Sequence, residues 1–205
     1  MPRDEAFSAA LAESDRAGLP AIQVSPPQGR LLELLARMLQ ARAILEIGTL
    51  GGYSTLWLAR GLAPGGRIVT LEVDPKHAEV AKRNFARAGR SNAIEQRLGP
   101  AIETLPRLLE ERAGPFDLIF VDADKPSLPD YFSWSMKLSR PGTLIVVDNV
   151  VREGDVVNAK SADASVQGVR RMNERIAAEP RVSATTLQTV GGKGYDGLAF
   201  VLVDR

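Results

Sequence analysis

The sequence predicts an α/β fold in which helices cover both faces of a doubly wound, mostly parallel sheet. Two observations lead to this prediction. Short apolar runs typical of buried strands alternate with stretches of helical periodicity through most of the 205 residues. The apolar run at 43–47 then breaks into a turn with three glycines, residues 48–52, which is followed by a helix. A strand, a glycine turn and a helix in this order form the cradle in which such folds hold a nucleotide.

The elements follow from the pattern in chain order. A weakly patterned helix at 4–17 is expected to lie outside the core, and a second helix, reaching about Gln40, begins with a capping box of Ser25 and Gln28. Strands are expected at 43–47, 67–73, 93–98, 116–121 and 143–147, and helices at 54–62, 75–88, 100–112 and 127–138. The chain closes with a helix at about 164–178 and two β-rich runs, 181–188 and 198–203, joined by a glycine-rich loop. This ending predicts a hairpin, and therefore an antiparallel edge on the sheet.

Length and composition predict a single domain, residues 1–205, that acts on small molecules. Lysine and arginine (26) exceed aspartate and glutamate (25) by one, which gives no electrostatic reason to expect nucleic acid or an anionic membrane as partner. Cysteine is absent, which excludes disulfides and zinc–thiolate sites. The first residues are charged and no apolar run approaches membrane-spanning length, so we expect a cytoplasmic protein.

The glycine turn predicts a nucleoside ligand without a pyrophosphate. A dinucleotide fingerprint needs G-x-G-x-x-G, and Leu50 stands where its second glycine should be. The strand before the turn carries Glu46, and the next strand ends at Glu72, where a carboxylate can accept hydrogen bonds from both hydroxyls of a ribose. The alternative for Glu72 is a helix cap or a solvent-facing acid, but Asp74 already holds the capping position. His77, the sole histidine, is expected at the surface, away from the strand ends.

Acidic residues also follow the fourth and fifth strands. If these strands are neighbours, Asp122 and Asp148 face each other, and two such carboxylates repel unless one takes a proton or a cation lies between them. Together with Asn149 they form an all-oxygen set that suits Mg²⁺, whereas the alternative is that they are turn and cap residues. Lys125 lies three residues after Asp122. Near a divalent cation its charged form is disfavoured, which makes it a candidate base; the alternative is a solvated loop lysine.

Taken together, these segments resemble the cation-dependent S-adenosylmethionine O-methyltransferases, the family of catechol and caffeoyl-CoA O-methyltransferases, over nearly the whole chain. The matching pieces are 46–54, Glu72, 99–101, 121–125, 148–149 and 195–197. The resemblance implies a seven-stranded Rossmann-like sheet of order 3-2-1-4-5-7-6 with strand 7 antiparallel. It also implies S-adenosylmethionine and a divalent cation, Mg²⁺, as cofactors.

The resemblance assigns roles residue by residue. The cofactor residues it implies are Val24, Glu46, Gly48, Thr49, Ser54, Glu72, Ala101 and Asp124. It places the metal on Asp122, Asp148 and Asn149 and makes Lys125 the catalytic base. We expect the helices of 1–40 to cover the site and the polar segment 150–165 to form a surface insertion near the acceptor.

The expected reaction is metal-dependent methyl transfer to a hydroxyl of an ortho-dihydroxy aromatic acceptor. A homodimer is expected, without nucleic-acid or membrane partners. Two alternatives remain open: an NAD-dependent oxidoreductase on a similar sheet, and a methyltransferase-like module that binds the cofactor without catalysis. Titration with S-adenosylhomocysteine (SAH) against NAD would separate the first of these from a methyltransferase.

Overall fold

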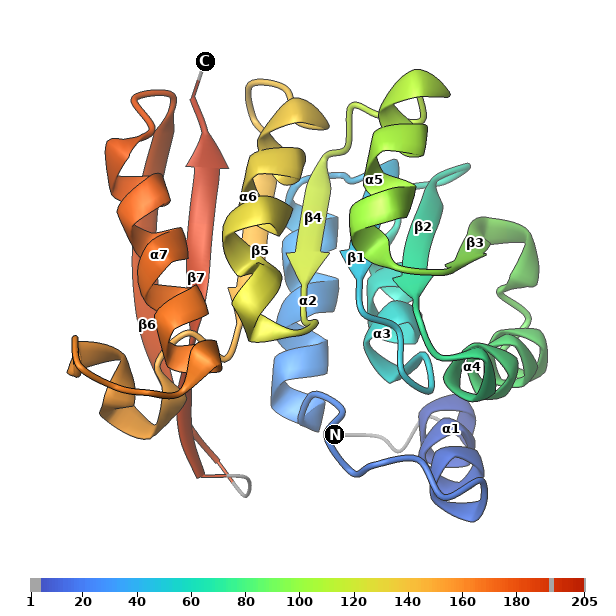
Figure 1. Cartoon of the computed structure of the whole chain (residues 1–205). Helices are drawn as coiled ribbons and strands as arrows, with labels where there is room; N and C mark the ends of the chain where they lie inside the picture. The colour runs from blue at the N-terminus through green and yellow to red at the C-terminus, as the bar shows by residue number, and fades with distance from the viewer. Residues whose placement is uncertain (1–4, 192–193, 205) are drawn as a thin grey trace. The chain divides into compact units, whose positions relative to one another are not determined.

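The computed structural model describes residues 5–191 and 194–204. Seven strands form one sheet with the order β3-β2-β1-β4-β5-β7-β6 (Figure 1). The pairing of β7 with both β5 and β6 is antiparallel. The predicted fold class and strand order are therefore confirmed. Contacts divide the chain into two compact units, Met1–Thr104 and Leu105–Arg205.

The first unit contains the glycine turn and the strands on either side of it. Its elements are α1 (Glu5–Arg16), α2 (Pro26–Met38), β1 (Ala43–Ile47), α3 (Tyr53–Gly61), β2 (Arg67–Glu72), α4 (Pro75–Arg87), a 3₁₀ turn (Ser91–Ala93), β3 (Ile94–Leu98) and the start of α5 (Ala101–Glu110). Strands β1, β2 and β3 pair in parallel, and the interior positions of β1 and β2 are buried. Helix α2 packs on α3, and α1 packs on α4.

Local capping chemistry explains where two of these helices begin. At the start of α2, Ser25 Oγ accepts a hydrogen bond from the Gln28 amide at 3.3 Å, and Gln28 Oε1 accepts one from the Ser25 amide at 3.2 Å. Before α4, Asp74 Oδ1 accepts from the Lys76 amide at 2.7 Å. Both caps were predicted from sequence, because each needs only residues adjacent in the chain.

Helix α1 departs from the sequence-based expectation that it lies outside the core. Phe7 is 7% exposed and Ala10 is 2% exposed. The Phe7 ring stacks on Trp57 of α3 with centroids 4.1 Å apart. The expectation was wrong because the buried face of α1 also carries the charged Glu13, which weakens the apolar pattern of the helix. Two arginines that pair with Glu13, Arg83 and Arg87, come from α4, so the sequence of α1 does not reveal them.

The second unit holds the remaining four strands. Its elements are β4 (Leu118–Val121), a 3₁₀ turn (Lys125–Ser127), α6 (Leu128–Lys137), β5 (Leu144–Asp148), 3₁₀ turns (Arg152–Val157), α7 (Ala164–Ala178), β6 (Val182–Gly191) and β7 (Gly194–Val203). The predicted hairpin is confirmed, but its strands extend into the region expected to be a glycine-rich loop. The loop positions 192–193 lie outside the described residues.

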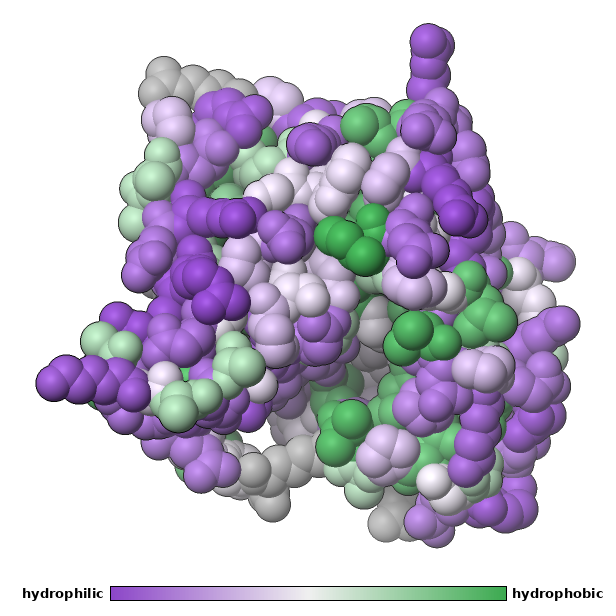
Figure 2. All heavy atoms as spheres, viewed as in Figure 1, coloured by the Kyte–Doolittle hydropathy of each residue, from purple (hydrophilic) through white to green (hydrophobic). Residues whose placement is uncertain are grey.

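The face drawn in Figure 2 is mostly hydrophilic, with scattered hydrophobic patches.

Three aromatic side chains lie in the core: Trp57, Phe85 and Phe120 are 5%, 3% and 1% exposed. Within the described residues, no helix is long and apolar enough to cross a membrane.

Candidate functional site

The glycine turn (residues 48–52) has a backbone that ordinary residues adopt with difficulty. Gly48 and Gly52 have φ angles of 99° and 79°, and Leu50 has a φ of 50°. A Cβ atom at Gly52 would lie 2.4 Å from Cε1 of Phe85, so only glycine fits where α3 begins. The turn therefore brings its backbone close to α4 at the carboxyl end of β1.

Glu72 holds this turn in place, a role that sequence reasoning did not find. Its Oε2 accepts hydrogen bonds from the amides of Thr49 and Leu50 at 3.2 and 2.6 Å. Its Oε1 accepts from the amides of Val73 and Asp74 at 3.0 and 2.9 Å. The carboxylate is only 7% exposed, so it is both an anchor of the turn and the acid expected at a ribose.

Two residues, His77 and Val73, lie beside Glu72 at the end of β2. Nδ1 of His77 lies 3.6 Å from Oε1 of Glu72, so the expectation that this histidine lies away from the strand ends was wrong. It was missed because the first turn of α4 folds back beside the end of β2, which spacing alone does not reveal. Val73, by contrast, is 64% exposed directly after the acid and offers an apolar surface there.

Glu46 is fully buried and satisfied by hydroxyl groups. Its Oε1 accepts from Ser54 at 2.6 Å, and its Oε2 accepts from Thr70 at 2.7 Å and also from Thr55. Thr49 adds a hydroxyl contact to Thr70 at 2.6 Å. The structure thus brings together three of the predicted cofactor residues, Glu46, Thr49 and Ser54, and ties β1 to the first turn of α3. Sequence reasoning missed Thr55 and Thr70, although β2 alternation places Thr70 on one face with Glu72.

Two further predicted cofactor residues lie at the edges of the first unit. Val24 is 5% exposed and directly precedes the cap of α2. Ala101 is the first residue of α5. Their contacts with a cofactor stay predictions, as do those of Gly48.

In the second unit, β4 and β5 pair in parallel with Val121 opposite Val147. Asp122 and Asp148 are the next residues of these strands, so they lie at the same edge, as predicted. Asp148 is 3% exposed. Burial, and then the charge of Asp122, raise the pKa of Asp148 to about 7.

Lys125 is buried rather than solvated. It is 8% exposed, and its Nζ lies 3.0 Å from Oδ1 of Asp122. The alternative of a solvated loop lysine is therefore wrong. The amine is therefore buried in direct contact with one carboxylate, that of Asp122.

Asn149 and Asp124 are the other two predicted residues that follow β5 and β4. Asn149 has a φ of 60°, and its backbone N–H donates to Oδ1 of Asp148 at 2.7 Å. Asp124 is exposed and accepts a hydrogen bond from the Tyr131 hydroxyl at 2.6 Å. Burial and this carboxylate raise the pKa of Tyr131, which keeps its phenol protonated as the donor.

The groups that could bind a metal ion here are the carboxylates of Asp122 and Asp148 and the side-chain amide oxygen of Asn149. Among residues 5–191 and 194–204, no group of three or more His, Cys, Asp or Glu side chains could hold a metal ion. Asp122, Asp148 and Asn149 would supply three oxygens, which leaves the remaining positions of a hard cation to water or acceptor oxygens. The placement of Asp122 and Asp148 at one edge, directly after the paired Val121 and Val147, is the observation that favours a cation here, because two close carboxylates otherwise repel.

Asp196 and Gly168 also support this edge. Asp196 belongs to the piece 195–197 that matched the family without an assigned role, and Gly168 was not found from sequence. Oδ1 of Asp196 accepts from the amides of Val151 and Arg152, both at 2.9 Å, and so shapes the segment that follows Asn149. A Cβ at Gly168 of α7 would lie 2.0 Å from the Lys125 carbonyl oxygen, so α7 packs directly on the backbone of the lysine. Both contacts join residues more than 40 positions apart, which local patterns cannot show.

The fold and these two groups of residues define a class of protein. A seven-stranded sheet of this order with an antiparallel β7 is the Rossmann-like methyltransferase fold. The chain belongs to the O-methyltransferase family, whose model matches residues 6–201. The class predicted from the sequence, an S-adenosylmethionine-dependent O-methyltransferase, is confirmed.

Similar proteins agree with this assignment. The chain is 55% identical over 200 residues to a catechol O-methyltransferase of Niastella koreensis, covering 98% of this chain and 90% of the relative. An O-methyltransferase from Bacillus cereus, solved in complex with SAH, is 55% identical with a TM-score of 0.98, covering 100% of this chain and 93% of the other. TomG from Streptomyces achromogenes, involved in tomaymycin synthesis and solved with SAM, is 52% identical with a TM-score of 0.95, covering 99% and 91%.

Proposed function

We propose that this enzyme transfers the methyl group of S-adenosylmethionine (SAM) to one hydroxyl of an ortho-dihydroxy aromatic acceptor, with the help of a divalent cation, Mg²⁺. The observation that carries the proposal is the buried pair of Lys125 and Asp148, with the partly exposed Asp122, at the carboxyl ends of β4 and β5. The name of the Niastella koreensis relative supports catechol as an acceptor, and the two solved relatives, one bound to SAH and one to SAM, support SAM as the donor.

The first unit supplies the residues for the cofactor. The N-terminus of α3 favours a carboxylate, which suits the methionine end of the cofactor. Glu72 is proposed to accept hydrogen bonds from the ribose hydroxyls. Its two oxygens already accept from four amides, two on each oxygen, so the hydroxyls would replace some of these donors. Val24 and Ala101 are proposed to contact the cofactor, and SAM supplies an electrophilic methyl group when bound.

The second unit supplies the residues for the acceptor. Asp122, Asp148 and Asn149 would hold the cation, whose charge favours the ionised form of an acceptor hydroxyl. Nζ of Lys125 pairs with Asp122, and this pairing weakens when the carboxylate shares its charge with a cation. Lys125 would act in its neutral form, after giving its own proton to water, and would accept the proton of the acceptor hydroxyl at Nζ. The acceptor oxygen attacks the methyl carbon in line; the O–C bond forms as the C–S bond breaks, and S-adenosylhomocysteine leaves with the electron pair.

Burial of these groups is the second contribution to catalysis. Lys125 and Asp148 are 8% and 3% exposed, so water has little access to screen the charges that change during the reaction. Holding the acceptor oxygen in one orientation also removes much of the entropic cost of a reaction between two bound molecules. The segment 150–165, whose start is held by Asp196, is proposed to border the acceptor, whereas Asp124 stays a predicted cofactor residue.

The test is methyl transfer from labelled SAM to catechol, with and without EDTA. We expect activity that EDTA abolishes and Mg²⁺ restores. Full activity after removal of metal would exclude Asp122, Asp148 and Asn149 as metal ligands. Binding of SAH without turnover of any ortho-dihydroxy aromatic compound would favour a non-catalytic binding module, and binding of NAD instead of SAH would favour the oxidoreductase. A single domain, a homodimer and a cytoplasmic location stay predictions.

A further inference from the structure

Helix α1 and the residues after it pack directly against the glycine turn. A Cβ at Gly51 would lie 2.1 Å from Ser14 Oγ and 3.5 Å from Cδ2 of Leu19. A larger residue at position 51 would force the Ser14 hydroxyl away from the Ala10 carbonyl to which it donates, so the glycine permits this close approach of α1 to the turn. The two ring contacts of Phe7, stacked on Trp57 at 4.1 Å and edge-on to Tyr53 at 5.8 Å, fix the other end of α1 on α3.

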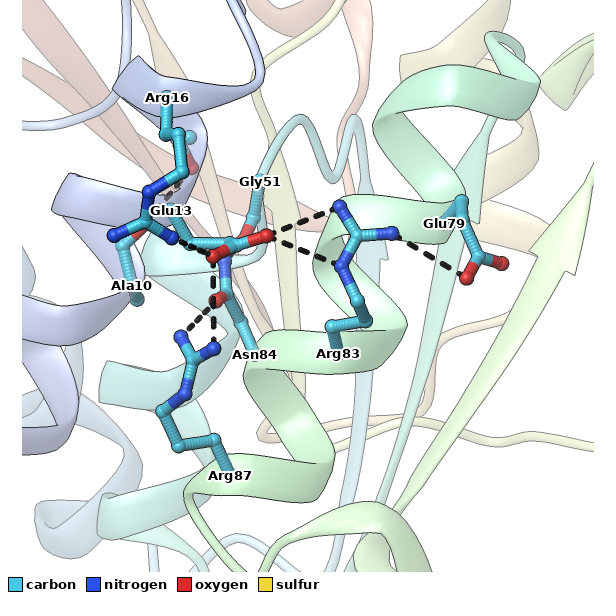
Figure 3. A network of polar contacts seen from close by, with 9 residues as sticks. Ala10, Glu13, Arg16, Gly51, Glu79, Arg83, Asn84 and Arg87 are labelled. Carbon is cyan, nitrogen blue, oxygen red and sulfur yellow. Dashed lines mark hydrogen bonds and ion pairs between the residues drawn. The ribbon is translucent and has the colours of Figure 1, made fainter.

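One buried amide joins α1, α4 and the turn. Asn84 of α4 is 2% exposed, and its Nδ2 donates to the Gly51 carbonyl at 2.9 Å and to the Ala10 carbonyl at 3.4 Å (Figure 3). Its Oδ1 accepts from Nη1 of Arg87 at 3.4 Å, which sets the orientation of the amide. Both N–H groups of one side chain thus donate to backbone carbonyls from two different segments.

A charge cluster holds α1 beside this amide. Glu13 is 9% exposed and lies 3.1 Å from Nη2 of Arg83 and 3.5 Å from Nη2 of Arg87, and it also pairs with Arg16 (Figure 3). One carboxylate therefore faces three guanidinium groups, two of which come from α4. Removal of its charge leaves these arginines close together without their shared acid, which weakens the attachment of α1 to α4.

We propose that Asn84 is a positioning residue for the cofactor, through its hydrogen bond to the Gly51 carbonyl, and that α1 stabilises this arrangement through Glu13. The inference rests on the proposed function in one respect, namely that SAM binds at the glycine turn. Asn84 fixes the peptide plane after Gly51, while Glu72 fixes those of Thr49 and Leu50 from the other side. The turn is thereby held ready for the cofactor before it binds, which lowers the ordering cost of binding.

The first experiment compares two variants of one position by calorimetric titration with SAH. Asn84→Leu and Asn84→Asp are close to asparagine in size, and neither can donate to the Gly51 carbonyl. We expect both to weaken SAH binding about tenfold, as the loss of a buried hydrogen bond of about 1.4 kcal/mol would. We also expect the KM for SAM to rise with a smaller change in kcat when catechol is the acceptor.

The matched control is Thr143→Val. Thr143 is fully buried, and its hydroxyl donates to the Phe116 carbonyl at 2.6 Å, at the start of β5 rather than at its carboxyl end. This variant also loses a buried hydrogen bond to a backbone carbonyl, so its thermal stability should fall, but its affinity for SAH should stay unchanged. Equal losses of affinity in this control and in the Asn84 variants would overturn the inference.

A second variant keeps the test decisive if the Asn84 variants do not fold. Glu13→Gln keeps the shape of α1 and removes the charge that Arg83 and Arg87 share, so we expect a smaller loss of SAH affinity, about threefold. Unchanged affinity in both folded Asn84 variants, or in Glu13→Gln if only that variant folds, refutes the positioning role. Failure of the unaltered enzyme to bind SAH would instead refute the proposed function and this inference with it.

Discussion

Replacement of Gly168 by alanine tests whether the backbone of Lys125 must stay where α7 holds it. The new Cβ would lie 2.0 Å from the Lys125 carbonyl oxygen, 2.7 Å from its carbonyl carbon and 2.8 Å from Cα of Pro126. Since carbon atoms in contact are about 3.5–4.0 Å apart, α7 and the turn of Lys125 must separate by about 1 Å. All three clashing atoms belong to the backbone, so no side chain can rotate away.

Two effects on stability oppose each other in this variant. Alanine in a helix interior is favoured over glycine by about 1 kcal/mol. Overpacking of a filled interior costs about 1–3 kcal/mol. We therefore expect a small net loss of stability, but a loss of kcat of about 10²-fold, because a shift of about 1 Å in a catalytic group costs that much. SAH affinity should change little, since the glycine turn lies in the first unit.

The assay is turnover of catechol under saturating SAM, together with thermal unfolding and SAH titration. Glu174→Ala, at an exposed position of the same helix, is the control and should keep its activity. An unchanged kcat in a folded Gly168→Ala variant would show that the position of the Lys125 backbone does not limit the reaction, and a rise in thermal stability would show that α7 does not pack as closely as the structure has it.

Three further variants address single groups. Lys125→Ala should keep SAH affinity and lose methyl transfer by about 10²–10⁴-fold, as expected for a general base; undiminished turnover would refute that role. Gly52→Ala should weaken SAH binding strongly, because the φ of 79° and Cε1 of Phe85 both oppose a side chain, and tight binding in this variant would contradict the geometry of the turn. Asp148→Asn should stabilise the metal-free protein at pH 8 and not at pH 4. The pKa of Asp148 is raised to about 7 in the folded state, so the wild-type protein loses stability as pH rises from about 4 to 7, and thermal scans in EDTA that show no such difference would contradict the pKa shift.

Local patterns predicted the elements well because the residues that decide them are neighbours in the chain. The capping box of Ser25 and the cap at Asp74 are complete within four residues, and both helices begin as expected. The end of the chain was predicted less well. Strands β6 and β7 run to Gly191 and from Gly194, because their cross-strand pairing overrides the turn preference of the glycines.

The sequence by itself determined the fold class, the family and the positions of the acids at the strand ends. These follow from periodicity and from residues that come directly after a strand, and the carboxyl ends of parallel strands meet at one edge. The pairing of Asp122 with Asp148 follows in this way from the order of the strands alone. What only the tertiary structure decided is how these groups are held. Three features depend on contacts that close packing makes between distant segments: the burial of Lys125 against α7, the amides of Thr49 and Leu50 on Glu72, and the side-chain amide of Asn84 on the Gly51 carbonyl. No local pattern in the chain encodes them.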